Sequence, residues 1–155
     1  MASKAFDIVV HGATGFTGRL VVEYLLQRAP AGIRWAMGGR SAAKLAAVRD
    51  ELGAPADTPL VVTDSSDPAS LQALVARTRL VLTTVGPYQL HGSALVQACA
   101  QAGTDYVDLC GEPGWMRQMI DAHQATAQAS GARIVFSCGF DSIPFDLGVW
   151  LLQQQ

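Results

Sequence analysis

The sequence predicts an α/β fold: a doubly wound parallel sheet of six strands with helices on both faces. One observation behind this prediction is alternation. Short apolar runs alternate along the chain with longer segments whose apolar residues recur at helical spacing. A second observation is that several of these runs are apolar throughout, which is typical of parallel strands covered on both faces. Short links between the segments favour right-handed crossovers.

The apolar runs give the expected strands in chain order. They are Phe6–Val10, Arg34–Gly38, Leu60–Thr63, Leu80–Thr84, Tyr106–Leu109 and Arg133–Ser137. Six strands in this alternation make two mononucleotide halves, for which the spatial order 3-2-1-4-5-6 is expected.

Capping residues mark several helix boundaries. Ser41 can cap the start of one helix, and Asp67 followed by Pro68 is typical of another start. Gly103 and Gly131 can each end a helix. A last, amphipathic helix is expected over Phe145–Leu152.

A glycine-rich segment directly follows the first expected strand. It reads Gly12-Ala13-Thr14-Gly15-Phe16-Thr17-Gly18. In a Rossmann-type fold such a turn holds a dinucleotide pyrophosphate at the start of the next helix. We assign Gly12 to the tight turn, Gly15 to the close approach of phosphate and Gly18 to packing of the helix on the strand. A plain glycine turn is the alternative, but the position between strand and helix favours dinucleotide binding.

The end of the second expected strand indicates which dinucleotide is bound. Sites for NAD carry an acidic residue there, whereas sites for NADP carry a basic one. This chain has Gly39, Arg40 and Ser41, with Lys44 one helical turn further on. Arg40 can bind a 2′-phosphate in a bidentate manner, and Ser41 can add its hydroxyl and nearby N–H groups. A solvated arginine is the alternative, but a cation at a helix start opposes the helix dipole, so we predict NADP(H) as the cofactor.

Two further segments complete the predicted cofactor site. Asp64 follows the third strand and can meet the adenine amino group, although a loop-capping aspartate is at least as common. The fourth strand leads into Val85-Gly86-Pro87-Tyr88, at the crevice where the strand order reverses. The backbone near Val85 and Gly86 should face the ribose and pyrophosphate. Tyr88 can act as a general acid, but a packing role is more common for such an aromatic residue.

The chain offers no recognisable set of catalytic side chains. Polar and sulfur-bearing residues cluster after the fifth and sixth strands, at Asp108, Cys110, Glu112, Cys138, Asp141 and Ser142. Cys110 has no evident histidine partner, and a packing role is more common. No Tyr-x-x-x-Lys pair occurs. We interpret His11, His91 and His123 as structural and predict no metal site.

Composition excludes several functional classes. The 155 residues carry a net charge of −2 with no basic run, so we expect no nucleic-acid binding. We expect no transmembrane segment and no signal peptide. Three cysteines without metal-like spacing indicate a reduced, cytoplasmic protein.

The composition and the end of the sequence suggest two domains. We expect residues 1–150 to form the dinucleotide-binding domain, and 151–155 to begin a truncated connection to an absent substrate domain. Half of the residues are hydrophobic, and the last helix offers more apolar surface than a sheet face would cover. We therefore expect the chain to self-associate as a homo-oligomer.

The motifs taken together resemble the saccharopine dehydrogenase-like oxidoreductases, which include the trans-acting enoyl reductases of lipid synthesis. The resemblance rests on the glycine-rich segment, Gly39-Arg40, Val85–Tyr88, Tyr106–Glu112 and Gly139–Asp146, all in the family's order. It covers the N-terminal dinucleotide-binding domain only. Cys110 departs from the threonine or serine expected there.

The resemblance implies an NADP(H)-dependent oxidoreductase that transfers hydride to an imine or a polarised C=C bond. It implies a small-molecule or acyl, lipid-type substrate held by the absent domain, so the present chain alone should be inactive. A redox sensor or regulatory module that binds NADP(H) without turnover is the alternative, because a fold does not determine a function.

Overall fold

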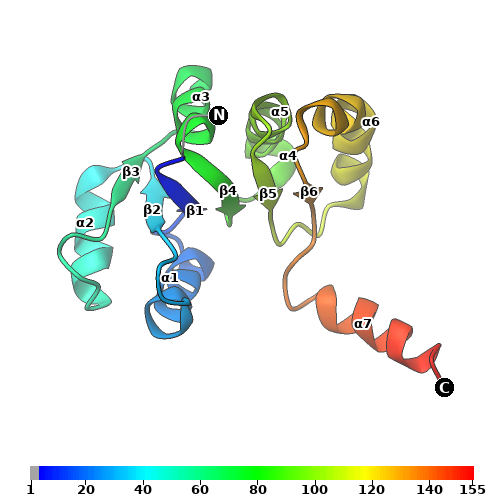
Figure 1. Ribbon diagram of the computed structural model, residues 1–155, viewed down its shortest axis with the longest axis horizontal. Coiled ribbons are helices and arrows are strands. Elements are labelled where there is room, and N and C mark those ends of the chain that lie inside the picture. The colour runs from blue at the N-terminus through cyan, green and yellow to red at the C-terminus, as the bar shows by residue number, and fades with distance from the viewer. Residues whose placement is uncertain (1–3) are drawn as a thin grey trace.

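The computed structural model describes residues 4–155 and contains one six-stranded sheet. The strands lie in the order β3-β2-β1-β4-β5-β6, and all neighbouring pairs are parallel. The predicted order 3-2-1-4-5-6 is therefore confirmed. Figure 1 shows the order reversing beside β1, where β2 and β4 lie on opposite sides of it.

The strands and helices have the following bounds. The strands are β1 (Phe6–His11), β2 (Trp35–Gly39), β3 (Leu60–Val62), β4 (Thr78–Thr83), β5 (Asp105–Val107) and β6 (Ile134–Val135). The helices are α1 (Phe16–Arg28), α2 (Ala42–Glu51), α3 (Pro68–Arg77), α4 (Tyr88–His91), α5 (Ser93–Ala102), α6 (Pro113–Ser130) and α7 (Ile143–Leu152).

Helices cover both faces of the sheet, as predicted. Helices α1 and α2 lie on one side of the sheet, and α3, α5 and α6 lie on the other (Figure 1). Alternate residues of β1 supply the two cores: Val10 packs with Val22 and Leu45 on the first side, and Val9 packs with Leu71 and Leu95 on the second. Because β1 is covered on both faces, it holds the glycine-rich turn on a rigid support.

The predicted helix caps are present. The Ser41 hydroxyl accepts a hydrogen bond from the Lys44 N–H (3.3 Å), and the Asp67 carboxylate accepts one from the Ala69 N–H (3.0 Å). Gly103 and Gly131 follow α5 and α6 in the left-handed conformation, with φ of 65° and 81°. Local capping chemistry therefore determines where these four helix ends fall.

Strand β6 is much shorter than the five residues expected. Only Ile134 and Val135 pair with β5. The chain then turns away at Ser137, whose φ of 59° makes it the one non-glycine residue with a positive φ among residues 4–155. A left-handed residue cannot continue a strand, so the ladder ends before the predicted boundary.

Helix α7 extends away from the rest of the molecule (Figure 1). Within the described residues of this helix none is buried. Apolar side chains are exposed around it, including Phe145 (70% exposed), Trp150 (61%) and Leu152 (69%). The predicted helix is present and begins two residues earlier than expected, at Ile143. Its exposed apolar side chains agree with the excess apolar surface that the sequence predicts, although they lie around the helix rather than on one amphipathic face.

Candidate functional site

The glycine-rich turn begins at the carboxyl end of β1. Gly12 has a φ of 92°, a conformation that favours glycine. Its N–H donates to the Gly38 carbonyl (3.0 Å), and its own carbonyl accepts from the Gly15 N–H (2.9 Å). A β-carbon at residue 12 would lie 2.8 Å from both Thr84 Oγ1 and Val85 Cγ2. The turn is therefore compressed between β2 and the end of β4.

The other two glycines of the motif have different surroundings. A β-carbon on Gly18 would lie 2.1 Å from the Gly12 carbonyl oxygen, so α1 packs directly on the turn. A β-carbon on Gly15 would meet only that same oxygen within 4 Å, at 3.4 Å. Gly15 caps α1 without a side-chain hydrogen bond, which leaves the N–H groups of the first helical turn available to an anion.

A polar cleft of about 320 Å³ opens above this turn. It lies where the strand order reverses, which is where open α/β sheets bind ligands. Its walls come from the ends of β1, β2 and β4 and from the loops that follow β3 and β4. The lining residues that the sequence predicted are Gly12, Thr14, Gly15, Gly39, Arg40, Asp64, Val85 and Gly86.

The remaining predicted site residues lie outside the lining of this cleft. Ala13 and Gly18 are buried, Phe16 and Lys44 are exposed, and Ser41 caps α2. Thr17 lines a separate hollow. Pro87 precedes α4, and Tyr88 belongs to the core. These residues shape the cleft or flank it.

Arg40 extends from the end of β2 at the mouth of the cleft. Its side chain is exposed and has no hydrogen-bond or ion-pair partner among residues 4–155. Thr63 N–H donates to the Gly39 carbonyl (3.0 Å), which fixes the backbone just before it. The guanidinium is thus anchored at its base and free to bind an anion in the cleft.

Asp64 fits the loop-capping interpretation and also lines the cleft. Its Oδ1 accepts hydrogen bonds from the N–H (2.9 Å) and hydroxyl (2.8 Å) of Ser66. These two bonds lower the pKa of Asp64, with smaller contributions from Arg40 and His11. The carboxylate therefore stays ionised beside the positively charged Arg40.

His11 lies in the wall of the cleft and is almost fully buried. Its Nε2 shares a hydrogen bond with the Ser65 hydroxyl (2.9 Å), and its Nδ1 has no partner within the described residues. Burial lowers the pKa of His11 to about 4, although the charge of Asp64 opposes this shift. The ring is therefore neutral at pH 7.

His91 is a cleft residue that sequence reasoning assigned to a structural role. It ends α4, is exposed, and lines the cleft together with Gly86 and Arg40. Its sequence position four residues after Pro87 gives no indication of this placement, because it depends on where the short helix α4 lies in the folded chain.

Tyr88 is buried, and its hydroxyl is used inside the protein. The hydroxyl donates to the Thr83 carbonyl (3.2 Å) and accepts from the Leu109 N–H (3.4 Å). Burial raises the pKa of Tyr88 to about 12. Glu112 accepts hydrogen bonds from the N–H groups of Tyr88 (2.8 Å) and Gln89 (2.9 Å). Both residues therefore support the α4 region rather than facing the cleft.

A second, largely apolar hollow of about 410 Å³ lies on the other side of the glycine-rich turn. It is bordered by the ends of β4 and β5, the start of α1 and the segment after β6. Its lining residues are Thr17, Val21, Leu82, Val107, Asp108, Leu109, Cys138, Gly139, Phe140 and Asp141. The turn thus separates a polar cleft from an apolar hollow.

The cysteines near this hollow have no histidine close to them in the hydrogen-bonding network of residues 4–155. Cys110 is buried, and burial raises its pKa; the same effect raises the pKa of Cys138. A raised pKa disfavours the thiolate, so neither group is activated as a nucleophile.

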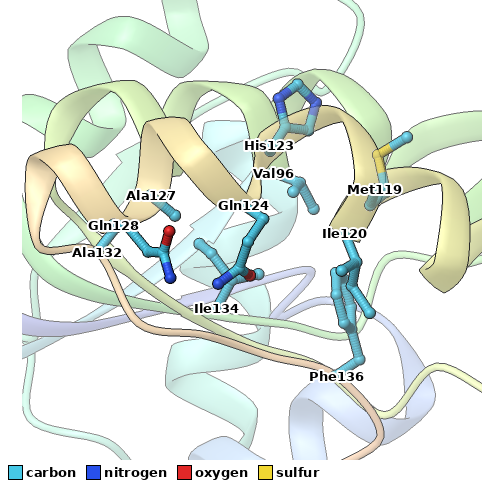
Figure 2. Close-up of a pocket in the computed structure, with 10 residues that line it drawn as sticks. All are labelled: Val96, Met119, Ile120, His123, Gln124, Ala127, Gln128, Ala132, Ile134 and Phe136. Atoms are coloured by element: carbon cyan, nitrogen blue, oxygen red, sulfur yellow. The ribbon is translucent and has the colours of Figure 1, made fainter.

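A third pocket of about 220 Å³ lies at the outer edge of the sheet. Figure 2 shows Ile120 of α6 extending toward Phe136 and Gln124 extending toward Ile134. It shares no lining residue with the polar cleft or the apolar hollow. The face of α6 that carries these residues thus borders a pocket separate from the glycine-rich turn.

Comparison with known families and proteins gives a consistent picture. The sequence model of the family described as "Saccharopine dehydrogenase NADP binding domain" matches residues 8–135. The chain is 53% identical over 149 residues to a trans-acting enoyl reductase of Mycobacterium ulcerans, covering 96% of this chain and 35% of that one. It is 50% identical over 155 residues to a trans-acting enoyl reductase of Mycobacterium bovis, covering 99% and 37%. The chain spans little more than a third of the length of these relatives.

Solved structures share the fold. An apo saccharopine dehydrogenase (L-Glu forming) from Saccharomyces cerevisiae matches with a TM-score of 0.70 at 20% identity, over 88% of this chain and 28% of that one. A triphenylmethane reductase of Citrobacter, complexed with NADP(H), matches with a TM-score of 0.61 at 23% identity, over 84% and 48%. At these identities the likeness establishes the fold alone.

Proposed function

Because the chain belongs to the family of saccharopine dehydrogenase NADP-binding domains, we propose that it is the cofactor-binding part of an oxidoreductase that transfers hydride to an imine or a polarised C=C bond. The family's cofactor is NADP(H). The mycobacterial relatives are named trans-acting enoyl reductases, and this favours a C=C bond conjugated to a carbonyl group as the acceptor.

The polar cleft above an uncapped helix N-terminus is the observation that carries this proposal. The first turn of α1 has free N–H groups, and the space above Gly15 is open. These features suit a pyrophosphate, since the N–H groups and the helix dipole both favour negative charge. The residues present therefore fit a dinucleotide, with Gly15 allowing the close approach of its pyrophosphate and Gly12 making the turn that precedes it.

Arg40 supports the choice of the phosphorylated cofactor. It lies at the end of β2 in the same cleft as Gly15 and has no hydrogen-bond or ion-pair partner in the described part of the chain. An acidic residue at this place would bind the ribose hydroxyls of NAD and repel a 2′-phosphate. His91 also lines this cleft, and its ring N–H would add a second donor for phosphate oxygens.

The apolar hollow is suited to the nicotinamide end. It lies across the glycine-rich turn from Arg40, at the ends of β4 and β5. When bound there, the nicotinamide ring supplies the hydride, and the protein supplies orientation and exclusion of water. Val21, Leu82 and Phe140 give this end of the proposed site an apolar lining.

We propose that a second domain completes the active site. The mycobacterial relatives are almost three times as long as the part of them that this chain covers. Helix α7 crosses the expected boundary at residues 151–155 and exposes apolar side chains throughout. We infer that it leads into the substrate domain, which holds a small-molecule or acyl-type substrate.

The location of the protein is a separate proposal. Among residues 4–155 no helix is both long and apolar enough to cross a bilayer. The three cysteines are unpaired in the described chain, which supports a reducing, cytoplasmic environment.

Calorimetric titration with NADPH and NADH, followed by an activity assay, tests the function. The chain should bind NADPH, and a version continued to the length of its relatives should oxidise NADPH with an enoyl thioester or an imine. Failure of the chain to bind either nucleotide would contradict the proposal. Binding without turnover by the longer protein across both acceptor classes would favour a redox sensor instead.

A further inference from the structure

One buried carboxylate joins the two loops that border the apolar hollow. Oδ1 of Asp108 accepts hydrogen bonds from the N–H groups of Cys110 (3.0 Å) and Ser137 (2.8 Å). Its Oδ2 accepts one from the Tyr106 hydroxyl (2.7 Å). Asp108 follows β5, whereas Ser137 follows β6. A single side chain therefore connects segments that are 29 residues apart.

Backbone groups strengthen the same connection. The Asp108 carbonyl accepts from the Cys138 N–H (2.7 Å), and the Ser137 hydroxyl donates to the Cys110 carbonyl (2.6 Å). Ser137 holds a φ of 59°, which is uncommon for a residue with a side chain and persists only where the surroundings enforce it. The hydrogen bonds of Asp108 and Ser137 provide that enforcement.

These connected residues form one wall of the apolar hollow. Asp108, Leu109 and Cys138 all line it, and Gly139 follows directly. A β-carbon on Gly139 would lie 2.9 Å from both Leu109 Cβ and Asp141 Oδ1, so the two loops touch closely. None of these residues lines the polar cleft. The wall therefore belongs to one end of the dinucleotide site only.

We propose that Asp108 is a positioning residue, which holds the loops after β5 and β6 together so that their wall places the nicotinamide ring of NADP(H). This inference rests on the proposed function. Asp108 acts through the loops it joins, because its oxygens already accept three hydrogen bonds from the protein. Burial raises the pKa of Asp108, and the three donated bonds oppose that shift.

If Asp108 has this role, replacing it should weaken the binding of the nicotinamide end of NADPH but not that of the adenosine end. Asp108→Ala removes all three acceptor contacts. Asp108→Asn is the matched control, because its amide oxygen can accept from Cys110 and Ser137 while its amide nitrogen donates to the Tyr106 hydroxyl, which can also accept. Adenosine 2′,5′-bisphosphate probes the polar cleft alone, and NADPH probes both ends.

Calorimetry and nicotinamide fluorescence of the bound 155-residue chain provide the measurement. In Asp108→Ala the affinity for adenosine 2′,5′-bisphosphate should stay within about twofold, as for independent sites. The affinity for NADPH should fall by about tenfold, which is about 1.4 kcal/mol, because binding must now order the loosened wall, and the nicotinamide emission should approach that of free NADPH. Asp108→Asn should resemble the unmodified chain in all three measurements.

Two results would overturn this role. Equal losses for both ligands in Asp108→Ala would indicate a general structural effect, and unchanged NADPH binding and emission would show that the wall does not place the ring. If Asp108→Ala does not fold, Ser137→Gly replaces it, since glycine adopts the required φ but loses the hydroxyl contact; its NADPH emission should fall, and an unchanged emission contradicts the inference. If the unmodified chain binds neither ligand, the proposed function itself fails.

Discussion

Gly18→Ala gives the sharpest test of how the glycine-rich turn is built. The added β-carbon would lie 2.1 Å from the Gly12 carbonyl oxygen, 2.7 Å from the Gly12 carbonyl carbon and 2.9 Å from Ala13 Cα. All three atoms are backbone, so relief requires α1 to move away from β1. Helix propensity favours alanine over glycine by about 1 kcal/mol, but overpacking of this kind costs about 3 kcal/mol or more.

The net loss of about 2 kcal/mol should lower the melting temperature by about 4–8 °C, given roughly 2–4 °C per kcal/mol for a chain of this size. Thermal unfolding followed by circular dichroism measures it. Gly114→Ala, at a helical position with no atom within 4 Å of the added carbon, is the control and should be as stable as the unmodified chain or slightly more so. A Gly18→Ala variant with an unchanged melting temperature would refute the packing argument.

Three further perturbations have defined outcomes. Gly15→Val should fold, because residue 15 has a φ of −79° in the extended region. It should not bind NADPH, because the valine side chain fills the space for the pyrophosphate. Normal NADPH binding by the folded variant would refute that assignment. Because the pKa of His11 is 6.5 in its ordinary state and about 4 when buried, the unfolded chain binds a proton before the folded one as the pH falls. The free energy of unfolding should therefore drop by about 2 kcal/mol between pH 7 and pH 5. Denaturant titrations should show this drop in the unmodified chain and in His123→Gln but not in His11→Leu. An equal drop in His11→Leu would assign the effect to another group. The 155-residue chain should bind NADPH without oxidising it and should self-associate through α7, where Phe145, Trp150 and Leu152 are exposed; turnover by this chain, or a strictly monomeric species in light scattering at high concentration, would contradict these two expectations respectively.

The parts of the fold that sequence reasoning predicted are those with local or topological causes. The strand order follows from alternation and crossover handedness. Four residues set helix boundaries through contacts within a few residues: Ser41 and Asp67 cap helix starts, and Gly103 and Gly131 cap helix ends. The turn at Gly12 and the helix packing at Gly18 follow from the steric needs of a strand–turn–helix unit.

The features that escaped prediction depend on distant contacts. The partners of the Tyr88 hydroxyl lie at Thr83 and Leu109, and Glu112 caps α4 from 24 residues away. His91, at the end of α4, lines the cleft together with residues from the ends of β1, β2 and β4. No sequence pattern specifies these pairings, because each depends on which strand ends the sheet brings together.

The early end of β6 has the same kind of cause. Five residues from Arg133 to Ser137 have strand-like composition, yet Ser137 is held at a φ of 59° by Asp108 and Cys110 of the neighbouring loop. A tertiary hydrogen-bond network thus overrides local β-propensity.

The ratio of NADPH to NADH affinity, measured by calorimetry before and after Arg40→Ala, tests the central claim most directly. A guanidinium bonded to the 2′-phosphate contributes about 1.5–3 kcal/mol, which corresponds to a preference for NADPH of about 10- to 150-fold. Arg40→Ala should remove most of this preference, whereas Arg28→Ala, an exposed residue at the C-terminal end of α1 outside the cleft, should retain it. Equal affinities in the unmodified chain, or an undiminished preference in Arg40→Ala, would contradict the account.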